Sequence, residues 1–383
     1  MYTTTASLTE HRDTVNCLTF SDDGLYLASG DDSGIVLVCK TQDPSQFDRY
    51  YFTDSVTSLL WIPGTKSLYA GLANCEVHYL SLEDERVYQM DFRPVGYEEM
   101  SPALQQLNQI SCLAFDPVHS WIAIGVGVMT IVISIRDFTK NKYTELCTIT
   151  PGRSNNRQLT HGQSPKALSA EVRSLHFTPS GRQIIVTTLE EGIRCFGIRD
   201  LTEKWRIGSH SYRIGRSALN IKGTLIVCSN LFDGFDLYDI ETRSYICTLP
   251  QTSPEHINVP LPVLFVHDNQ EILIGSAHGK VQIRPIAENG GDTCVLDHAS
   301  DIIQAIAYGQ IASNSYIATA CSEKGSNTYV KLWVRSPMAK QVLQHPGVYS
   351  YREVSPLSQS LPKYAEGPFH GRGPLLKDLA VRG

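Results

Sequence analysis

A short pattern of apolar positions recurs along the chain. It consists of an apolar residue, two variable residues, an apolar residue, one variable residue, and then an aromatic or apolar residue. A strand-like segment that returns at a regular spacing indicates a repeat architecture. The seven copies are VNCLTF from Val15, VTSLLW from Val56, ISCLAF from Ile110, VRSLHF from Val172, RSALNI from Arg216, LPVLFV from Leu261 and IQAIAY from Ile303.

The spacing of these copies predicts the fold. Four of the six intervals lie near the roughly 40–45 residues of a four-stranded propeller blade. The two longer intervals contain polar segments, residues 93–108 and 151–170, which read as surface insertions. Each copy is followed by a dense β-branched run, a turn and an alternating run, and long helical periodicity is absent. The sequence therefore predicts an all-β fold, a seven-bladed β-propeller of four-stranded antiparallel blades.

The two ends of the repeat region predict how the ring closes. An open ring would expose edge strands that can pair with other chains. Residues 2–9 contain strand-forming Thr and Leu, so we expect them to complete the last blade beside residues 329–334. The propeller is thus expected to occupy residues 1–335. Residues 336–383 contain six prolines, which predicts an irregular C-terminal tail. The favoured interpretation is a poorly ordered terminus; the alternatives are a segment that packs along the propeller and a linear recognition motif.

The first and last copies carry a more specific signal. The segment of residues 10–30 resembles the opening half of a WD repeat. His11 stands where that family has its Gly-His, residues 21–24 match the first turn, and residues 27–30 match the second strand. The last copy ends in VKLWV, with Trp333 at the family's Trp position. The chain is identified as a divergent member of the WD-repeat β-propeller family.

The resemblance covers roughly residues 1–335 and includes departures. The Trp position holds Cys39 in the first blade and Tyr238 in the fifth, and the Asp that follows the family's Trp is Val334 here. The family's hydrogen-bonded His–Ser–Asp–Trp network is therefore expected to be incomplete in every blade. Packing between blades is expected to rely on apolar contacts more than on polar networks.

Composition and charge narrow the function classes. The chain is 42% hydrophobic and 19% charged, as in a globular protein. A net charge of -6 argues against direct binding of nucleic acid, which usually requires a basic excess. The charge is uneven, because residues 335–383 carry seven basic and three acidic side chains. The body of the chain is therefore acidic and the tail mildly basic.

The cysteines and the N-terminal residues indicate the cellular compartment in which the protein is expected. The 10 cysteines are scattered singly with no C-x-x-C pair, so a zinc motif is lacking. We expect reduced, buried thiols and an intracellular location, cytoplasmic or nuclear. The N-terminus lacks the features of a signal peptide, and no stretch approaches the roughly 18 apolar residues of a membrane span, so membrane insertion is not expected.

Catalytic motifs were sought without success. The chain has no G-x-S-x-G elbow, H-E-x-x-H pair or P-loop. Asp31-Asp32 and Glu190-Glu191 fall in corresponding turns of two blades and are interpreted as solvated turns rather than acid–base pairs. We therefore expect a protein that is not an enzyme and has no cofactor or metal. The alternative is a lactonase-like propeller hydrolase with a metal in the central channel.

The resemblance also implies where partners bind. WD-repeat propellers bind peptides and proteins over the face that carries the loops before each inner strand and the turns between second and third strands, here called the loop face. Acidic residues outnumber basic ones on it, and Tyr212 and Phe232 are expected to act as apolar anchors. The expected partner-binding residues are Arg12, Asp31, Asp32, Asp54, Asn108, Glu171, Glu190, Glu191, His210, Tyr212, Arg213, Phe232, Asp233, His256, His278 and Asp301.

The function that follows is a scaffold for protein or peptide partners, with basic segments as a candidate ligand class. A chromatin or histone-tail reader is a special case of this function. The propeller is expected to act as a monomer or as a subunit of a larger complex.

Overall fold

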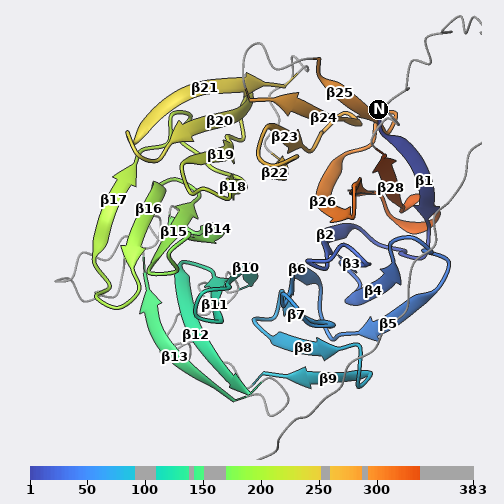
Figure 1. Ribbon diagram of the computed structural model, residues 1–383, viewed down its shortest axis with the longest axis horizontal. Helices are drawn as coiled ribbons and strands as arrows, with labels where there is room; N and C mark the ends of the chain where they lie inside the picture. The colour runs from blue at the N-terminus through green and yellow to red at the C-terminus, as the bar shows by residue number, and fades with distance from the viewer. Residues whose placement is uncertain (91–108, 138–141, 151–169, 252–258, 287–291, 337–383) are drawn as a thin grey trace, which may run out of the picture. The chain divides into compact units, whose positions relative to one another are not determined.

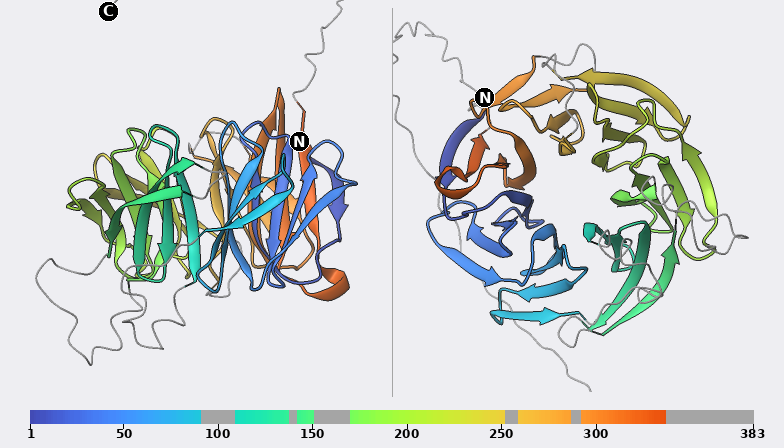
Figure 2. Two further views of the ribbon diagram at one scale, coloured as in Figure 1. Left: turned by 90° about the horizontal axis from the view of Figure 1, so that it is seen from below. Right: turned by 180° about the vertical axis from the view of Figure 1, so that it is seen from behind.

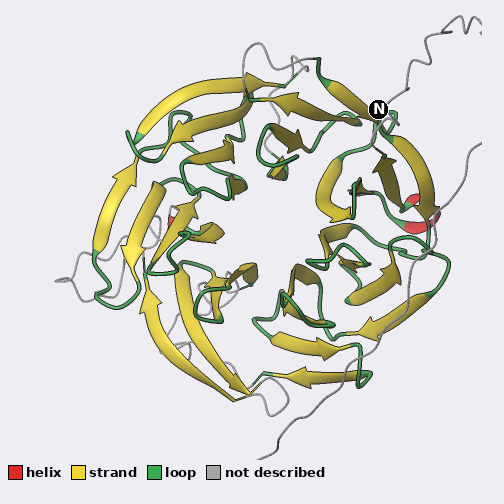
Figure 3. Ribbon diagram, viewed as in Figure 1, coloured by secondary structure: helices red, strands yellow, loops and turns green. Residues whose placement is uncertain are grey.

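The protein is a ring of seven blades in a computed structural model that describes residues 1–90, 109–137, 142–150, 170–251, 259–286 and 292–336. The strands form seven separate four-stranded sheets around one axis (Figure 1). All pairings within the sheets are antiparallel. Apart from a 3₁₀ turn at Gly325–Asn327, the described elements are strands joined by loops (Figure 3). The predicted all-β seven-bladed propeller is confirmed.

The first strand of each blade lies nearest the ring axis, and first strands of neighbouring blades contact one another around it (Figure 1). Blades are numbered here in chain order from the sheet that begins at Val15. The first strands are β2 (Val15–Phe20), β6 (Val56–Trp61), β10 (Ile110–Asp116), β14 (Val172–Phe177), β18 (Ser217–Leu219), β22 (Val263–Val266) and β26 (Ile303–Ile311).

The remaining strands follow outward from the axis in each blade. The second strands are β3 (Tyr26–Asp31), β7 (Ser67–Leu72), β11 (Trp121–Val126), β15 (Gln183–Thr188), β19 (Leu225–Ser229), β23 (Glu271–Ile274) and β27 (Asn314–Cys321). The third strands are β4 (Ile35–Lys40), β8 (Val77–Ser81), β12 (Met129–Asp137), β16 (Gly192–Gly197), β20 (Gly234–Asp239), β24 (Lys280–Pro285) and β28 (Val330–Arg335). The outer strands are β5 (Phe47–Tyr51), β9 (Arg86–Gln89), β13 (Lys142–Ile149), β17 (Glu203–Ile207), β21 (Ser244–Pro250), β25 (Cys294–Asp297) and β1 (Thr3–Leu8).

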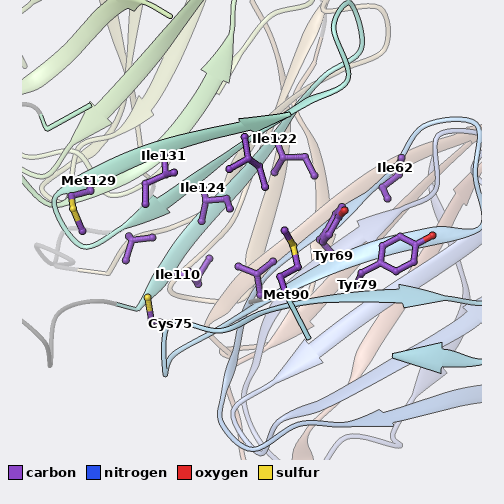
Figure 4. Packing of buried hydrophobic residues seen from close by; sticks show 13 residues of the cluster. Ile62, Tyr69, Cys75, Tyr79, Met90, Ile110, Ile122, Ile124, Met129 and Ile131 are labelled. Carbon is purple, nitrogen blue, oxygen red and sulfur yellow. The ribbon is translucent and has the colours of Figure 1, made fainter. Parts of the chain in front are cut away.

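The core consists of the layers between neighbouring blades. Second strands such as β7 are buried along their whole length, because a blade packs against each of their faces. One layer joins blades 2 and 3, where Tyr69 and Met90 lie against Ile110 and Ile131 (Figure 4). Burial of each such side chain contributes about 1.5–3 kcal/mol. The ring is therefore stabilised chiefly by apolar surfaces shared between blades.

Both ends of the described chain meet in blade 7. Strand β1 pairs antiparallel with β28, with Thr3 opposite Val334 and Leu8 opposite Val330. Tyr2 is buried, and its hydroxyl lies 2.7 Å from Nε2 of His267 in blade 6. This pairing leaves β28 with no open edge for another chain to occupy. Of the predicted tail, residues 337–383 lie outside the described residues.

Two first strands begin later than the repeated pattern does. In blade 6 the ladder starts at Val263 rather than Leu261, because Pro262 has no N–H with which to pair. In blade 5 the ladder starts at Ser217. Just before it, the N–H of Gly215 donates to Ser229 and the N–H of Ser229 donates to Arg216, so Ser229 faces two residues and Arg216 lies outside the regular pairs.

Candidate functional site

The strands of every blade run between the two faces of the ring (Figure 2). The chain direction repeats from blade to blade, so the loops before the first strands and the turns between second and third strands all open onto one face. This is the loop face, where the sequence places its candidate residues.

A buried polar cluster holds the loop face of blade 1. Asp31 is 0% exposed and lies 2.6 Å from Nδ1 of His11. The other ring nitrogen of His11 lies 2.7 Å from the Ser29 hydroxyl. Asp31 also accepts hydrogen bonds from the backbone N–H groups of Ser33 and Ile35. Burial would raise the pKa of Asp31, but the hydrogen bonds from His11, Ile35 and Ser33 outweigh it and lower the pKa.

A longer cluster holds blade 7. Trp333 donates from its indole N–H to the Thr319 hydroxyl at 2.9 Å, and that hydroxyl lies 3.0 Å from Nε2 of His298. Nδ1 of His298 lies 3.1 Å from the Tyr329 hydroxyl, which donates to Asp301 at 2.6 Å. Because the Tyr329 hydroxyl donates to Asp301, it accepts from Nδ1–H of His298, and a neutral His298 accepts from the Thr319 hydroxyl at Nε2. Burial lowers the pKa of His298 to about 4, in agreement with that assignment.

Blade 5 presents exposed aromatic side chains on the loop face. Tyr212 is 86% exposed and Phe232 is 51% exposed. The ring of His210 stacks on Tyr245 with 4.0 Å between centroids. Beneath them, the backbone N–H of His210 donates to the buried hydroxyl of Tyr238. Blade 5 therefore combines a surface of aromatic rings with a hydrogen-bonded support.

Three of the predicted acidic side chains of the loop face, Glu171, Glu190 and Glu191, are paired with arginines. Glu190 accepts from Arg213 at 2.9 Å, and both side chains are exposed. Glu191 accepts from Arg194 at 2.7 Å. In blades 1 and 2, Asp32 accepts from the amide of Asn16, and Asp54 accepts from the backbone N–H of Ser55. Within the described part of the chain no ion pair to Asp32 or Asp54 is present. Lys324 pairs with Asp13, whose contact raises the pKa of Lys324, and the charge of Asp32 raises it further.

Two arginines lie near the ring axis between blades 3 and 5. Nη1 of Arg173 lies 3.3 Å from Glu171. Burial lowers the pKa of Arg173, and repulsion from Arg216 and Arg213 lowers it further against the attraction of Glu171. Arg216 extends from blade 5 to the carbonyl of Ser111 in blade 3, at 3.2 Å.

A pocket of about 490 Å³ opens on the opposite face and is lined by residues of blades 4, 5, 6 and 7. Leu264 and Phe265 line it beside His176, whose ring lies 2.9 Å from the Ser217 hydroxyl. Three consecutive residues of its wall, residues 267–269, have positive φ angles. Such strained turns recur at binding sites, but also at tight hairpins such as this one between β22 and β23.

Comparison with known families agrees with this architecture. The family model described as WD domain, G-beta repeat matches residues 2–39. The matched segment begins with β1, the outer strand of blade 7, and continues through β2 and β3 into β4 of blade 1. The chain is a WD-repeat β-propeller. No curated protein matches it.

Partial polar networks are present in two blades of this WD-repeat propeller, and each lacks one member of the family's set. Blade 1 has the His, Ser and Asp members, with Cys39 in place of Trp. Blade 7 has the Trp, hydroxyl and His members, and Tyr329 connects them to Asp301. Cys321 lies opposite Ile303, where blade 1 has Asp31 opposite Val15, and the carboxylate of blade 7 comes instead from Asp301 in the loop before β26.

The predicted site residues fall into four groups on the WD-repeat propeller. The exposed ones are Arg12, Asp54, Glu190, His210, Tyr212, Arg213, Phe232, Asp233 and His278. The half-buried ones are Asp32, Glu171, Glu191 and Asp301. Asp31 is buried and presents no carboxylate to the surface, since its oxygens hold the turn of blade 1. Asn108 and His256 lie outside the described residues.

Sequence reasoning missed Arg173 and Arg216. Both occupy the position after the first apolar residue of the repeated pattern, where other blades have Asn16, Thr57 and Ser111. Arg173 could have been noticed in the sequence, because it is charged at a position where other blades have the neutral residues Asn16, Thr57 and Ser111. At Arg216 the alignment was shifted by one residue, which hid the correspondence.

Among the described residues no group of three or more His, Cys, Asp or Glu side chains is placed to hold a metal ion. In the same residues no helix is long and apolar enough to cross a membrane.

Proposed function

We propose that this WD-repeat propeller is a non-enzymatic scaffold that binds protein or peptide partners over its loop face, with blade 5 as the centre of contact. The observation that carries the proposal is the pair of exposed aromatic side chains, Tyr212 and Phe232. Exposed aromatic and arginine side chains supply most of the binding energy in protein interfaces. Arg213 lies next to Tyr212 in the same loop.

The loops that carry these rings are held in place before any partner binds. The Ser211 hydroxyl donates to the buried carboxylate of Asp236. The side-chain oxygen of Asn230 accepts from the backbone N–H groups of Phe232, Asp233 and Gly234. A preorganised loop loses less conformational entropy on binding, so more of the contact energy appears as affinity.

Basic segments of a partner fit a different part of the loop face. Asp32 and Asp54 lie on adjacent blades, connected by the Ser55 hydroxyl, which donates to the backbone carbonyl of Asp32 at 2.9 Å. Neither carboxylate forms an ion pair within the described residues, which favours contact with cationic side chains of a ligand. A chromatin or histone-tail reader would use this part of the face.

The cysteines support an intracellular setting for the scaffold. All ten are free, and seven of them are buried. Burial raises the pKa of the Cys39 and Cys195 thiols to about 12, which keeps them protonated and unreactive. Free thiols in this number are typical of a reducing compartment, the cytoplasm or the nucleus.

The experiment that tests the proposal compares two faces of one blade. The variant Tyr212→Ser with Phe232→Ser removes the aromatic surface. The control Ile221→Ser removes an apolar side chain that is 79% exposed on the opposite face of blade 5. Proteins captured with the tagged full chain are quantified by mass spectrometry. We expect the double variant to lose partners that the control retains, and equal partner sets for wild type, control and double variant would refute blade 5 as the centre.

A separate test addresses the basic-segment proposal. Asp32→Asn with Asp54→Asn removes two charges without changing side-chain size. We expect weaker capture of lysine-rich partners and a weaker dependence of their binding on salt. Unchanged capture at low salt would remove the acidic surface from the proposal while leaving blade 5 untouched.

A further inference from the structure

One residue near the start of the first strand is set apart from the ladder in most blades. The register shifts by one residue at this point in five first strands, and a bulge of this kind re-aims the side chain of the unpaired residue. The unpaired residues are Asn16, Thr57, Ser111, Arg173 and Gln304. They are half-buried, so solvent reaches this belt of side chains from the ring axis.

The neutral members of the belt use their polar groups to join blade to blade. The Gln304 amide lies 3.4 Å from the side-chain oxygen of Asn16. The Asn16 amide lies 3.3 Å from the carbonyl of Val56, and the Thr57 hydroxyl donates to the carbonyl of Ile110. On blades 7, 1 and 2 the belt is therefore committed to structural hydrogen bonds.

Arg216 extends across the axis side of blade 4. Arg216 belongs to blade 5, and its guanidinium donates to the carbonyl of Ser111 on blade 3, so the side chain connects the two neighbours of blade 4. Its charge reaches two thiols on other blades: burial raises the pKa of Cys17 in blade 1 and of Cys112 in blade 3, and the attraction of Arg216 opposes both shifts. A cation whose charge acts on thiols of both blade 1 and blade 3 lies close to the ring axis.

Arg173 lies on β14 of blade 4, the blade between the two that Arg216 connects. Its side chain is 23% exposed, and its buried Nε has no hydrogen-bond partner. One carboxylate, Glu171, accompanies Arg173, and in the described residues no ion pair is formed by Arg216. The belt itself contributes no carboxylate. Arg216 lies close enough for its charge to repel that of Arg173, and two guanidinium groups with one counter-charge favour a further anion.

We infer that Arg173 and Arg216 form an oxyanion site on the ring axis beneath the loop face, for a carboxylate or phosphate carried by a partner's side chain. The inference rests on the proposed docking over the loop face, and it specifies the chemistry of the group that enters the axis. Guanidinium groups present paired N–H donors that match both oxyanions. Exposed Tyr212 and Phe232 belong to the same blade as Arg216, so a segment docked on blade 5 has the site within reach.

The test measures small anions on the full chain, so that it is independent of any partner. Inorganic phosphate, O-phosphoserine and glutamate are titrated by calorimetry and thermal shift at constant ionic strength. Binding lowers the free energy of the folded state and raises Tm. The variants are Arg216→Gln and Arg173→Gln. The matched control is Arg206→Gln, which removes an arginine that is 71% exposed on outer strand β17.

The expected result is saturable binding of at least one anion by wild type and Arg206→Gln, with affinity reduced tenfold or more in Arg216→Gln and in Arg173→Gln. Preference for phosphoserine or for glutamate identifies the source of the oxyanion. Arg216→Lys keeps the charge and substitutes for Arg216→Gln if that variant does not fold. We expect Arg216→Lys to retain weaker binding. No saturable binding of any of the three anions, or equal binding by wild type and the axis variants, would overturn the site.

The outcome is separable from that of the scaffold proposal. Loss of partners in the Tyr212→Ser and Phe232→Ser variant with no anion binding would refute the oxyanion site alone. Anion binding with unchanged partner capture would refute docking on blade 5 alone.

Discussion

Replacing Asp31 by Ala tests whether a residue at the loop face supports the fold or contacts partners. Asp31 and Asp32 are adjacent and chemically identical in the sequence. The structure gives them different surroundings, because Asp31 is buried with His11 while Asp32 is half-buried and accepts from Asn16. The two Ala variants should therefore differ strongly in stability.

The magnitude follows from the donors that lose their acceptor. Ser33 is exposed, so water replaces the carboxylate at its N–H and hydroxyl. His11 is buried and Ile35 is half-buried, and each is left unsatisfied at a cost of about 1–3 kcal/mol. We expect Asp31→Ala to destabilise the fold by about 3–5 kcal/mol, the range for breaking a buried pair. Asp32→Ala should cost less than about 1 kcal/mol.

The assay is thermal unfolding of the full chain followed by circular dichroism at pH 7.5. An unfolding entropy of about 2.1 cal/mol/K per residue gives about 1.4 °C per kcal/mol for a propeller of this size, so Asp31→Ala should lower Tm by roughly 4–7 °C. The lowered pKa of Asp31 means that its contribution is present above the usual value of 3.8 and is lost as the pH falls through the folded-state pKa. Equal Tm values for the two Ala variants would refute the reasoning.

Three further predictions concern other blades. At pH 5.5 the unfolded chain binds a proton at His298 that the folded chain, with its pKa of about 4, does not; this costs about 1.4 kcal/mol relative to pH 7.5, and His298→Gln should remove that part of the shift in urea midpoint. Tyr238→Phe should cost about 1–3 kcal/mol in thermal unfolding, because Asp236 and the His210 N–H lose a buried partner; no change in Tm would contradict this. Deleting residues 1–9 should lower Tm and expose the edge of β28, and a deletion variant that remains monomeric in light scattering with wild-type Tm would show that closure is dispensable.

The number of blades could be predicted from the sequence because the repeated signal is local. Each copy is a few apolar residues of one strand, and first strands β2, β6, β10, β14 and β26 begin where the pattern does. In blade 6 the first strand begins two residues later than the pattern predicts, because Pro262 has no backbone N–H to pair. The predicted start of the first strand was also displaced in blade 5. There Ser229 bonds to both Gly215 and Arg216, which leaves Arg216 outside the regular pairs.

The candidate site was less predictable, since charge in the sequence does not reveal what surrounds it. Glu190 and Glu191 look acidic in sequence, but Arg213 and Arg194 accompany them in space. The exposed aromatic residues Tyr212 and Phe232 were predicted, because a turn residue with no strand pattern around it has little apolar surface to pack against.

The sequence by itself therefore determined the strands, their sevenfold recurrence and the face on which the loops lie, because these follow from residue periodicity and chain direction. Tertiary structure alone decided which charges remain available. Closing the ring brings Arg216 of blade 5 against Ser111 of blade 3, 105 residues away in the chain, and within electrostatic reach of Arg173. Such a meeting depends on the geometry of seven packed blades, and no local pattern of residues encodes it.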